Sequence, residues 1–202
     1  MVVFGPVPSR RLGHSLGINH IPPKTCTYAC VYCQLGLTTR MQITRQSFYP
    51  GDDVVEAVRE HLSTVRTRGE PVDYLTLVPD GEPTLDANLD ALIRALRPFG
   101  IPIAVISKSS LITEKTVRNA LAQADWVSLK VDAADHETWR KVDRPHGALN
   151  LATILQSAQR FADTYQGKLV TETMLVAGAN DHVGAITATA QAVAALKPAT
   201  AY

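Results

Sequence analysis

The stretch DYLTLVPDGEPTLDANLDALIRALRPFGIPIAVIS, residues 73–107, contains a complete strand–helix–strand unit. Residues 73–79 and 101–107 are short apolar runs with β-branched side chains, which is typical of parallel strands covered on both faces. Between them, residues 88–98 repeat leucine and isoleucine at helical spacing and end at Pro98. Such a crossover joins two parallel strands with right-handed geometry. The stretch therefore predicts an α/β fold.

The same alternation continues on both sides of this unit. Further strands are predicted at 14–19, 125–131 and 168–176, and further helices at 52–69, 113–123, 150–163 and 181–198. The residues after Pro198 begin to resemble a sixth strand. We therefore expect a single core domain over residues 1–202, a partial (βα)6 TIM-like barrel of parallel strands that is cut off at the sixth strand.

The composition is that of an ordinary globular protein, with 46% hydrophobic and 19% charged residues in a chain of 202. A formal net charge of +1 gives no support to a nucleic-acid partner or an anionic membrane surface. The N-terminus has only a three-residue apolar run, and no segment is long and apolar enough to span a bilayer. We therefore expect a cytoplasmic protein, in a compartment where thiols stay reduced.

All three cysteines of the chain lie in one short loop after the first predicted strand, KTCTYACVYCQ at 24–34. Their odd number and tight spacing argue against a disulfide framework. A structural zinc ion would need a fourth ligand, for which His14 and His20 are available. In an iron–sulfur cubane, three thiolates leave one iron open, whereas a pure electron carrier fills all four positions. The absence of a fourth cysteine therefore favours chemistry at the cluster.

The spacing C-x3-C-x2-C, with an aromatic residue directly before the last cysteine, resembles the signature of the radical S-adenosylmethionine superfamily. This resemblance implies that Cys26, Cys30 and Cys33 bind a [4Fe–4S] cluster and that Tyr32 lies beside the adenine. It also implies an enzyme that cleaves S-adenosylmethionine to a 5′-deoxyadenosyl radical, which abstracts hydrogen from an unknown substrate. An external electron donor of the flavodoxin or ferredoxin type is then expected.

The loop after the next strand, PDGEPTLD at 79–86, is similar to the superfamily's Gly-Gly-Glu motif, which receives the methionyl ammonium. Asp80 replaces the first glycine, while Gly81 and Glu82 match. A cation needs backbone carbonyls and a carboxylate, and small residues expose that backbone. The same letters also suit an ordinary turn into a helix.

Later strand ends supply further cofactor candidates. Ser107 and Ser128 match positions whose hydroxyls face the methionyl carboxylate in related members, although such serines often cap local backbone. Lys130 and Asp132 share the face of Ser128, so they are expected to line the cofactor or substrate pocket, or to pair with each other.

MLVAGAND, residues 174–181, resembles the segment whose backbone packs against adenine. Gly178 would allow close approach, and Asn180 would reach the ribose or cap the following helix. The stretches FGPVPSRRLGHSLGI before the cysteines, PPKTC at 22–26 and RPHG at 144–147 resemble the subgroup of Fe–S oxidoreductases akin to wyosine synthases and nitrogenase-cofactor maturation enzymes. The candidates for substrate contact are Arg10, Arg11, Arg144 and His146. An RNA substrate would fit the wyosine-like resemblance, but the net charge does not support it.

Two other functions stay open at this point. A zinc-stabilised structural or interaction module would be recognised by metal analysis. A non-catalytic iron–sulfur electron carrier would be recognised because S-adenosylmethionine would leave its spectrum unchanged.

Overall fold

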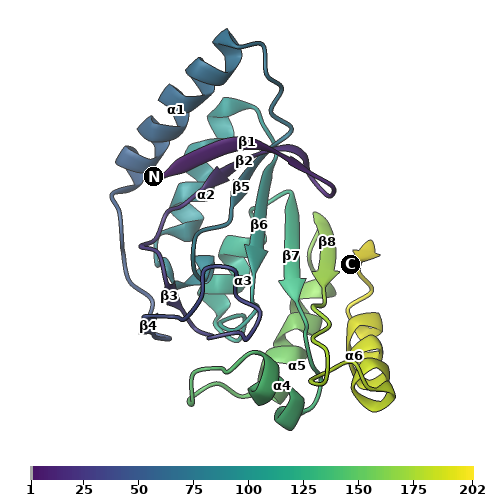
Figure 1. Ribbon diagram of the computed structural model, residues 1–202. Helices are drawn as coiled ribbons and strands as arrows, with labels where there is room; N and C mark the ends of the chain where they lie inside the picture. The colour runs from purple at the N-terminus through teal and green to yellow at the C-terminus, as the bar shows by residue number, and fades with distance from the viewer. Residues whose placement is uncertain (1) are drawn as a thin grey trace.

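The computed structural model describes residues 2–202 and consists mainly of one curved sheet flanked by helices (Figure 1). The sheet has seven strands in the order β1-β2-β5-β6-β7-β8-β9. Its parallel strands are β2 (Gly13–Ile18), β5 (Tyr74–Leu77), β6 (Ile103–Ser107), β7 (Trp126–Lys130), β8 (Lys168–Glu172) and β9 (Thr200–Ala201). The α/β fold with a partial barrel of parallel strands is therefore confirmed, including a strand after Pro198.

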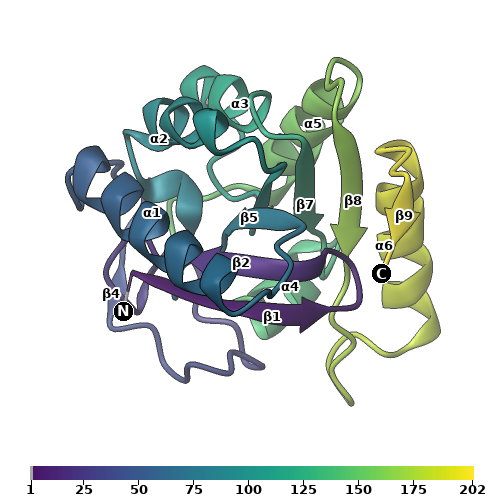
Figure 2. The same ribbon diagram turned by 90° about the horizontal axis from the view of Figure 1, so that it is seen from above.

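Except for α4 (His136–Val142), which lies below the ends of the strands in Figure 1, the helices form an arc outside the curved sheet, as Figure 2 shows from above. The helices are α1 (Gly51–Thr67), α2 (Leu89–Leu96), α3 (Lys115–Leu121), α4 (His136–Val142), α5 (Leu151–Ala162) and α6 (Val183–Ala195), with 3-10 turns η1 (Pro83–Leu85) and η2 (Arg97–Phe99). None of them, within residues 2–202, has the length and hydropathy needed to cross a bilayer.

The two faces of the sheet pack differently. Alternate strand residues such as Leu75, Val105 and Val127 are fully buried in the main core beneath the helices. Burial of each such side chain stabilises the fold by about 1.5–3 kcal/mol. The concave face carries a smaller cluster in which Leu12 packs with Trp126 and its neighbours. The interior of the half-barrel is thus filled at the amino ends of the strands, which leaves polar chemistry to the carboxyl ends.

An antiparallel strand, β1 (Val3–Ser9), precedes the barrel and was not predicted from the sequence. It pairs with β2 through Val3 opposite Ile18, and its register shifts before Val7. The prolines in this segment obscured the strand pattern, but proline is tolerated at a sheet edge, where β1 lies.

The turn between β1 and β2 reaches across to the other end of the sheet, as Figure 1 shows. Arg11 in this turn forms an ion pair with Glu172 at the end of β8. Its guanidinium carbon also lies 5.0 Å from the ring centroid of Tyr202, just after β9. The hairpin therefore bridges the open seam between the two ends of the sheet.

Two further elements differ from the predictions. Strand β8 ends at Glu172 rather than at residue 176, because the Met174 amide turns to donate to Asp132 Oδ1 at 2.7 Å. Helix α4 was not predicted between β7 and α5. Asp135 is its N-cap, because the Oδ1 of this residue accepts the Thr138 amide at 2.8 Å.

Candidate functional site

The loop that carries the cysteines lies at the carboxyl ends of the strands and is bonded to the turn after β5. The Lys24 amide donates to the Asp80 carbonyl at 2.7 Å, and the Glu82 amide donates to the Thr25 carbonyl at 3.2 Å. A Cβ atom on Gly81 would lie 2.0 Å from that same Thr25 oxygen. Glycine is required at position 81 because no side chain fits between the two loops. The structure thus brings the predicted Gly-Glu pair directly against the cysteine loop.

The other side of the cysteine loop is held by the end of α4. Amides of Ala29 and Val31 donate to the carbonyls of Asp143 and Val142 at 3.1 and 2.9 Å. The short strands β3 (Thr25–Cys26) and β4 (Arg40–Met41) pair in parallel and enclose the loop. Backbone bonds on both sides therefore fix the path of all three cysteines.

The thiols themselves are free, and their environment differs. Cys26 and Cys30 are buried, while Cys33 is partly exposed. Burial raises the pKa of Cys26 to about 11 and that of Cys30 to about 12. A bound iron ion is a large local positive charge that holds such thiols as thiolates. Three soft ligands from one loop fit an iron–sulfur cluster.

The donors suggested for a zinc site are not arranged to bind one. Burial lowers the pKa of His20 to about 4, and its Nε2 lies 3.3 Å from the Pro83 carbonyl oxygen. His14 is at the opposite end of β2 from the cysteines and contacts Asp73. Within residues 2–202, no three His, Cys, Asp or Glu side chains are grouped to hold a single ion. The zinc alternative is not favoured.

Glu82 is fully buried and connects the turn after β5 to the end of β6. Its Oε1 accepts bonds from the Thr84 amide at 3.1 Å, the Thr84 hydroxyl at 2.5 Å and the Ser107 hydroxyl at 2.7 Å. Its Oε2 accepts the Lys108 amide at 2.7 Å. Because Oε2 accepts only this one bond among the described residues, whereas Oε1 accepts three, Oε2 can accept a further donor.

Ser107, predicted to face the methionyl carboxylate, uses its hydroxyl within the protein. The Oγ donates to Glu82 and accepts the Ser109 amide at 3.0 Å. Ser128 differs, because its Oγ is buried and has no hydrogen-bond partner among the described residues. A buried hydroxyl without a protein partner is free to hydrogen-bond a bound molecule. Contact of either serine with the cofactor stays a prediction.

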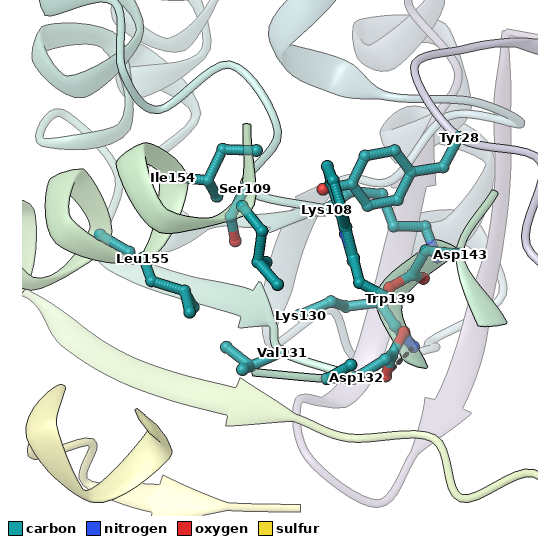
Figure 3. Close-up of a pocket in the computed structure, with 13 residues that line it drawn as sticks. Tyr28, Lys108, Ser109, Lys130, Val131, Asp132, Trp139, Asp143, Ile154 and Leu155 are labelled. Atoms are coloured by element: carbon teal, nitrogen blue, oxygen red, sulfur yellow. Dashed lines mark ion pairs between the residues drawn. The ribbon is translucent and has the colours of Figure 1, made fainter. Parts of the chain in front are cut away.

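Tyr32 lies among four charged side chains. Its hydroxyl donates to Asp132 and lies 3.5 Å from Asp143 Oδ1, while Lys108 and Lys130 place their ammonium nitrogens 5.2 and 4.7 Å from the ring centroid. Burial raises the pKa of Tyr32 far above its ordinary value, so the ring stays a neutral donor. Figure 3 shows both lysines and both aspartates on one side of a small pocket.

Lys130 and Asp132 do pair, although loosely, at 3.9 Å. Lys130 also binds Glu172 at 3.1 Å, and Glu172 in turn binds Arg11. Burial opposes ionisation of Glu172, but its bonds with Arg11 and Lys130 outweigh this and lower its pKa. A chain of charges therefore runs from the β1–β2 turn to Tyr32. Arg11, predicted to contact substrate, is occupied in this chain.

The loop after β8 is held mainly by its own polar groups. The Asn180 amide group donates to the carbonyls of Asp132 and Met174, both at 2.8 Å. Gly178 has a φ of +69°, a left-handed conformation that glycine adopts without strain. The Asn180 contacts orient Asp132 and its loop, and contact of Gly178 or Asn180 with adenine or ribose stays a prediction.

Sequence reasoning missed two residues of this site. Lys108 directly follows the predicted Ser107, and its ammonium reaches only the Tyr32 hydroxyl, at 3.4 Å, among the hydrogen bonds found in residues 2–202. Asp143 accepts a bond from the Cys30 thiol at 3.3 Å, and burial followed by the nearby Asp132 charge raises its pKa to about 7. Their positions next to quoted strand-end and loop motifs were the only signal.

Comparison with known proteins identifies the family of this chain. The family model described as the radical SAM superfamily matches residues 21–187. A UPF0026 protein of Methanocaldococcus jannaschii is 47% identical over 201 residues, which is 100% of this chain and 62% of that relative. The chain thus spans about three fifths of that relative's length.

Solved structures show the same fold at low identity. TYW1 with a lysine–pyruvate adduct bound has a TM-score of 0.65 at 14% identity, covering 93% of this chain and 64% of that one. SuiB of Streptococcus suis bound to S-adenosylmethionine has a TM-score of 0.63 at 17% identity, covering 88% of this chain and 37% of that one. Superfamily members use a [4Fe–4S] cluster and S-adenosylmethionine as cofactors. The family match over most of the chain, together with the cysteine loop at the carboxyl end of a partial barrel, shows that this chain belongs to the radical S-adenosylmethionine superfamily of enzymes.

Proposed function

We propose that Cys26, Cys30 and Cys33 hold the [4Fe–4S] cluster with one iron open, and that S-adenosylmethionine binds there against the turn at Gly81 and Glu82. The observation that carries this proposal is the close contact between Gly81 and the Thr25 carbonyl. It joins the cysteine loop and the predicted ammonium-binding turn into one rigid unit. When bound, the two cofactors supply the electron and the sulfonium whose reductive cleavage begins hydrogen abstraction from a substrate.

The residues of this chain prepare that site in separable ways. Glu82 is a fully buried carboxylate with one bonding direction left on Oε2, which suits a charge-assisted bond from an ammonium group. Asp132 and the two lysines orient Tyr32, whose ring then forms one wall of the site. Cys26 and Cys30 are buried, so water has little access to two of the three proposed cluster ligands.

The substrate stays unassigned. Arg144 and Arg10 carry no ion pair among the described residues, so they remain candidates for substrate contact. His146 is partly engaged, because its Nδ1 accepts the Ala148 amide at 3.2 Å. We place the enzyme in the cytoplasm with an external electron donor, since cysteine ligands and a reducible cluster require a reducing compartment.

The test is anaerobic reconstitution with iron and sulfide, followed by electron paramagnetic resonance with and without S-adenosylmethionine. The protein is expected to bind iron in cubane proportion, to change its spectrum when S-adenosylmethionine is added, and to form 5′-deoxyadenosine under reduction. Cys30→Ala serves as the control without a complete ligand set. Zinc at one per chain would support a structural module instead. A cluster whose spectrum ignores S-adenosylmethionine would support a simple electron carrier.

A further inference from the structure

The part of the chain that carries the cysteines has no acidic residue. Residues 1–51 contain five lysines and arginines but no aspartate or glutamate, whereas the whole chain has 20 basic and 19 acidic residues. Residues 52–202 therefore hold 15 basic and all 19 acidic residues. The near-neutral total conceals a basic segment around the cluster loop and an acidic remainder.

This basic segment presents an apolar surface directly beside the cysteines. Leu35 and Leu37 are 44% and 75% exposed, so this short loop presents two neighbouring apolar side chains to solvent. The Lys24 ammonium donates to the Leu37 carbonyl at 2.9 Å, and the Arg40 amide donates to the Lys24 carbonyl at 3.0 Å. These four residues, Lys24, Leu35, Leu37 and Arg40, are termed the cysteine-loop surface.

Among residues 2–202, neither Lys24 nor Arg40 forms an ion pair with an acidic side chain. The ion pairs found within residues 2–202 involve other basic side chains, such as Arg97 with Asp125 and Arg45 with Glu114. Arg40 is exposed and Lys24 is partly exposed. A pair of exposed leucines flanked by unpaired cations matches the usual plan of a transient interface, with an apolar centre and a charged rim.

The surface also lies on a short path to the cluster ligands. The Gly36 amide, between the two leucines, donates to the Cys33 carbonyl at 2.9 Å. Cys33 is the most accessible of the three thiols, since Cys26 and Cys30 are both only 8% exposed. An electron arriving at this surface would enter through the loop that holds the cluster, without crossing the filled interior of the barrel.

We propose that the cysteine-loop surface is the docking site for the external electron donor, and that this donor is a small acidic redox protein. The inference rests on the proposed function, because only a cluster at the three cysteines needs electrons here. Acidic side chains on the donor would complement Lys24 and Arg40, and an apolar rim around its redox centre would cover Leu35 and Leu37. Complementary charge speeds such encounters, and the apolar contact supplies affinity.

An RNA partner is the other polyanion that a basic segment could attract. Single-stranded nucleic acid is held by aromatic side chains on which bases stack, together with several cations. The exposed large hydrophobic side chains of this loop are aliphatic, and the surface offers only two cations. The observations therefore favour a protein.

The experiment measures the rate of cluster reduction in the anaerobically reconstituted protein by stopped-flow absorbance. Two reductants are compared, a reduced acidic flavodoxin and dithionite, which needs no docking. Leu37→Asp and Arg40→Glu are expected to slow reduction by flavodoxin about tenfold or more, since each reverses the complementarity of the rim or centre. Reduction by dithionite and the iron content are expected to match those of the wild type.

Two variants elsewhere serve as matched controls. Val183→Asp changes an 81% exposed apolar side chain on α6, and Arg68→Glu reverses an exposed charge after α1. Both are expected to keep the wild-type rate with flavodoxin. Equal rates for Leu37→Asp, Arg40→Glu and wild type would overturn the proposal, as would equal slowing by the control variants. Loss of RNA binding in Arg40→Glu, with flavodoxin reduction unchanged, would assign the surface to RNA instead.

The same measurements distinguish failure of the proposed docking site from failure of the proposed function. A protein that fails to bind iron would refute the proposed cluster and be recognised from its metal content alone. A protein whose cluster is reduced normally by flavodoxin, and slowly in the two variants, yet makes no 5′-deoxyadenosine would keep the docking site and refute the cofactor chemistry.

Discussion

Removal of the Glu82 side chain tests whether this carboxylate stabilises the fold, in addition to its proposed role in binding the methionyl ammonium. The structure shows a fully buried carboxylate that accepts four hydrogen bonds, two of them from backbone amides. In Glu82→Ala the two hydroxyl donors can rotate to new partners, but the amides of Thr84 and Lys108 cannot. Each orphaned amide costs about 1–3 kcal/mol, so the two together are expected to lower the free energy of unfolding by about 2–6 kcal/mol.

The assay is urea unfolding of the cluster-free protein, with circular dichroism as the measure of the folded fraction. Ser107→Ala is the matched control, because it removes one donor to Glu82 and leaves the carboxylate in place. Ser107→Ala is expected to lower the free energy of unfolding by about 1 kcal/mol. A loss of under about 1 kcal/mol in Glu82→Ala would contradict the hydrogen bonds described here.

Glu82→Gln separates the second role, because it keeps the shape of the side chain but removes its charge. It is expected to fold and to load its cluster with a moderate loss of stability. If Oε2 receives the methionyl ammonium, the variant loses a charge-assisted bond worth about 1.5–3 kcal/mol. Titration of S-adenosylmethionine into the cluster-loaded variant should then show affinity lowered about ten- to a hundredfold. Wild-type affinity would mean that Glu82 is purely structural.

Three further changes test other parts of the structure. Alanine at any one of the three cysteines is expected to abolish the cluster, measured as loss of iron and visible absorbance; full loading would refute the ligand set. Gly81→Ala places a methyl group 2.0 Å from the Thr25 carbonyl oxygen, so iron loading is expected to fall while the sheet stays folded by circular dichroism. Normal loading would contradict that close contact. Arg11→Ala leaves Glu172 paired with Lys130 alone and is expected to lower the free energy of unfolding by about 1–2 kcal/mol, against under about 1 kcal/mol for the exposed Arg59→Ala. Because the ion pairs lower the pKa of Glu172 in the folded state, this difference should be full above the ordinary glutamate pKa of 4.5 and should be lost as the pH falls through the lowered pKa of the folded state; an equal difference in strong acid would contradict the pair.

The barrel could be predicted because its elements repeat with a fixed period. Residues 73–107 show strand and helix periods clearly, and the strands and helix appear within them as expected. The β1 strand and α4 could not be predicted in the same way. Prolines interrupt β1, which is stable because β2 provides its backbone partner. Helix α4 is short, so its position depends on the Asp135 cap and on packing of Trp139 against Tyr28.

The site was predictable where chain order alone decides position. Parallel strands place their carboxyl ends together, so the cysteine loop and the Gly81–Glu82 turn had to meet. Which atoms meet inside that region depends on side-chain directions in irregular loops, which no period describes. Lys108 and Asp143 were missed for this reason, and the second role of Ser107 as a donor to Glu82 was not foreseen either.

The contact between Arg11 and Glu172 joins residues 161 positions apart in the chain. Contacts of such long range form late, because the entropy of closing a long loop must be overcome first. During synthesis the N-terminal hairpin and all three cysteines emerge from the ribosome before β8 exists. The hairpin can therefore bind across the sheet only after β8 has formed, so this bridging contact is among the last to be made.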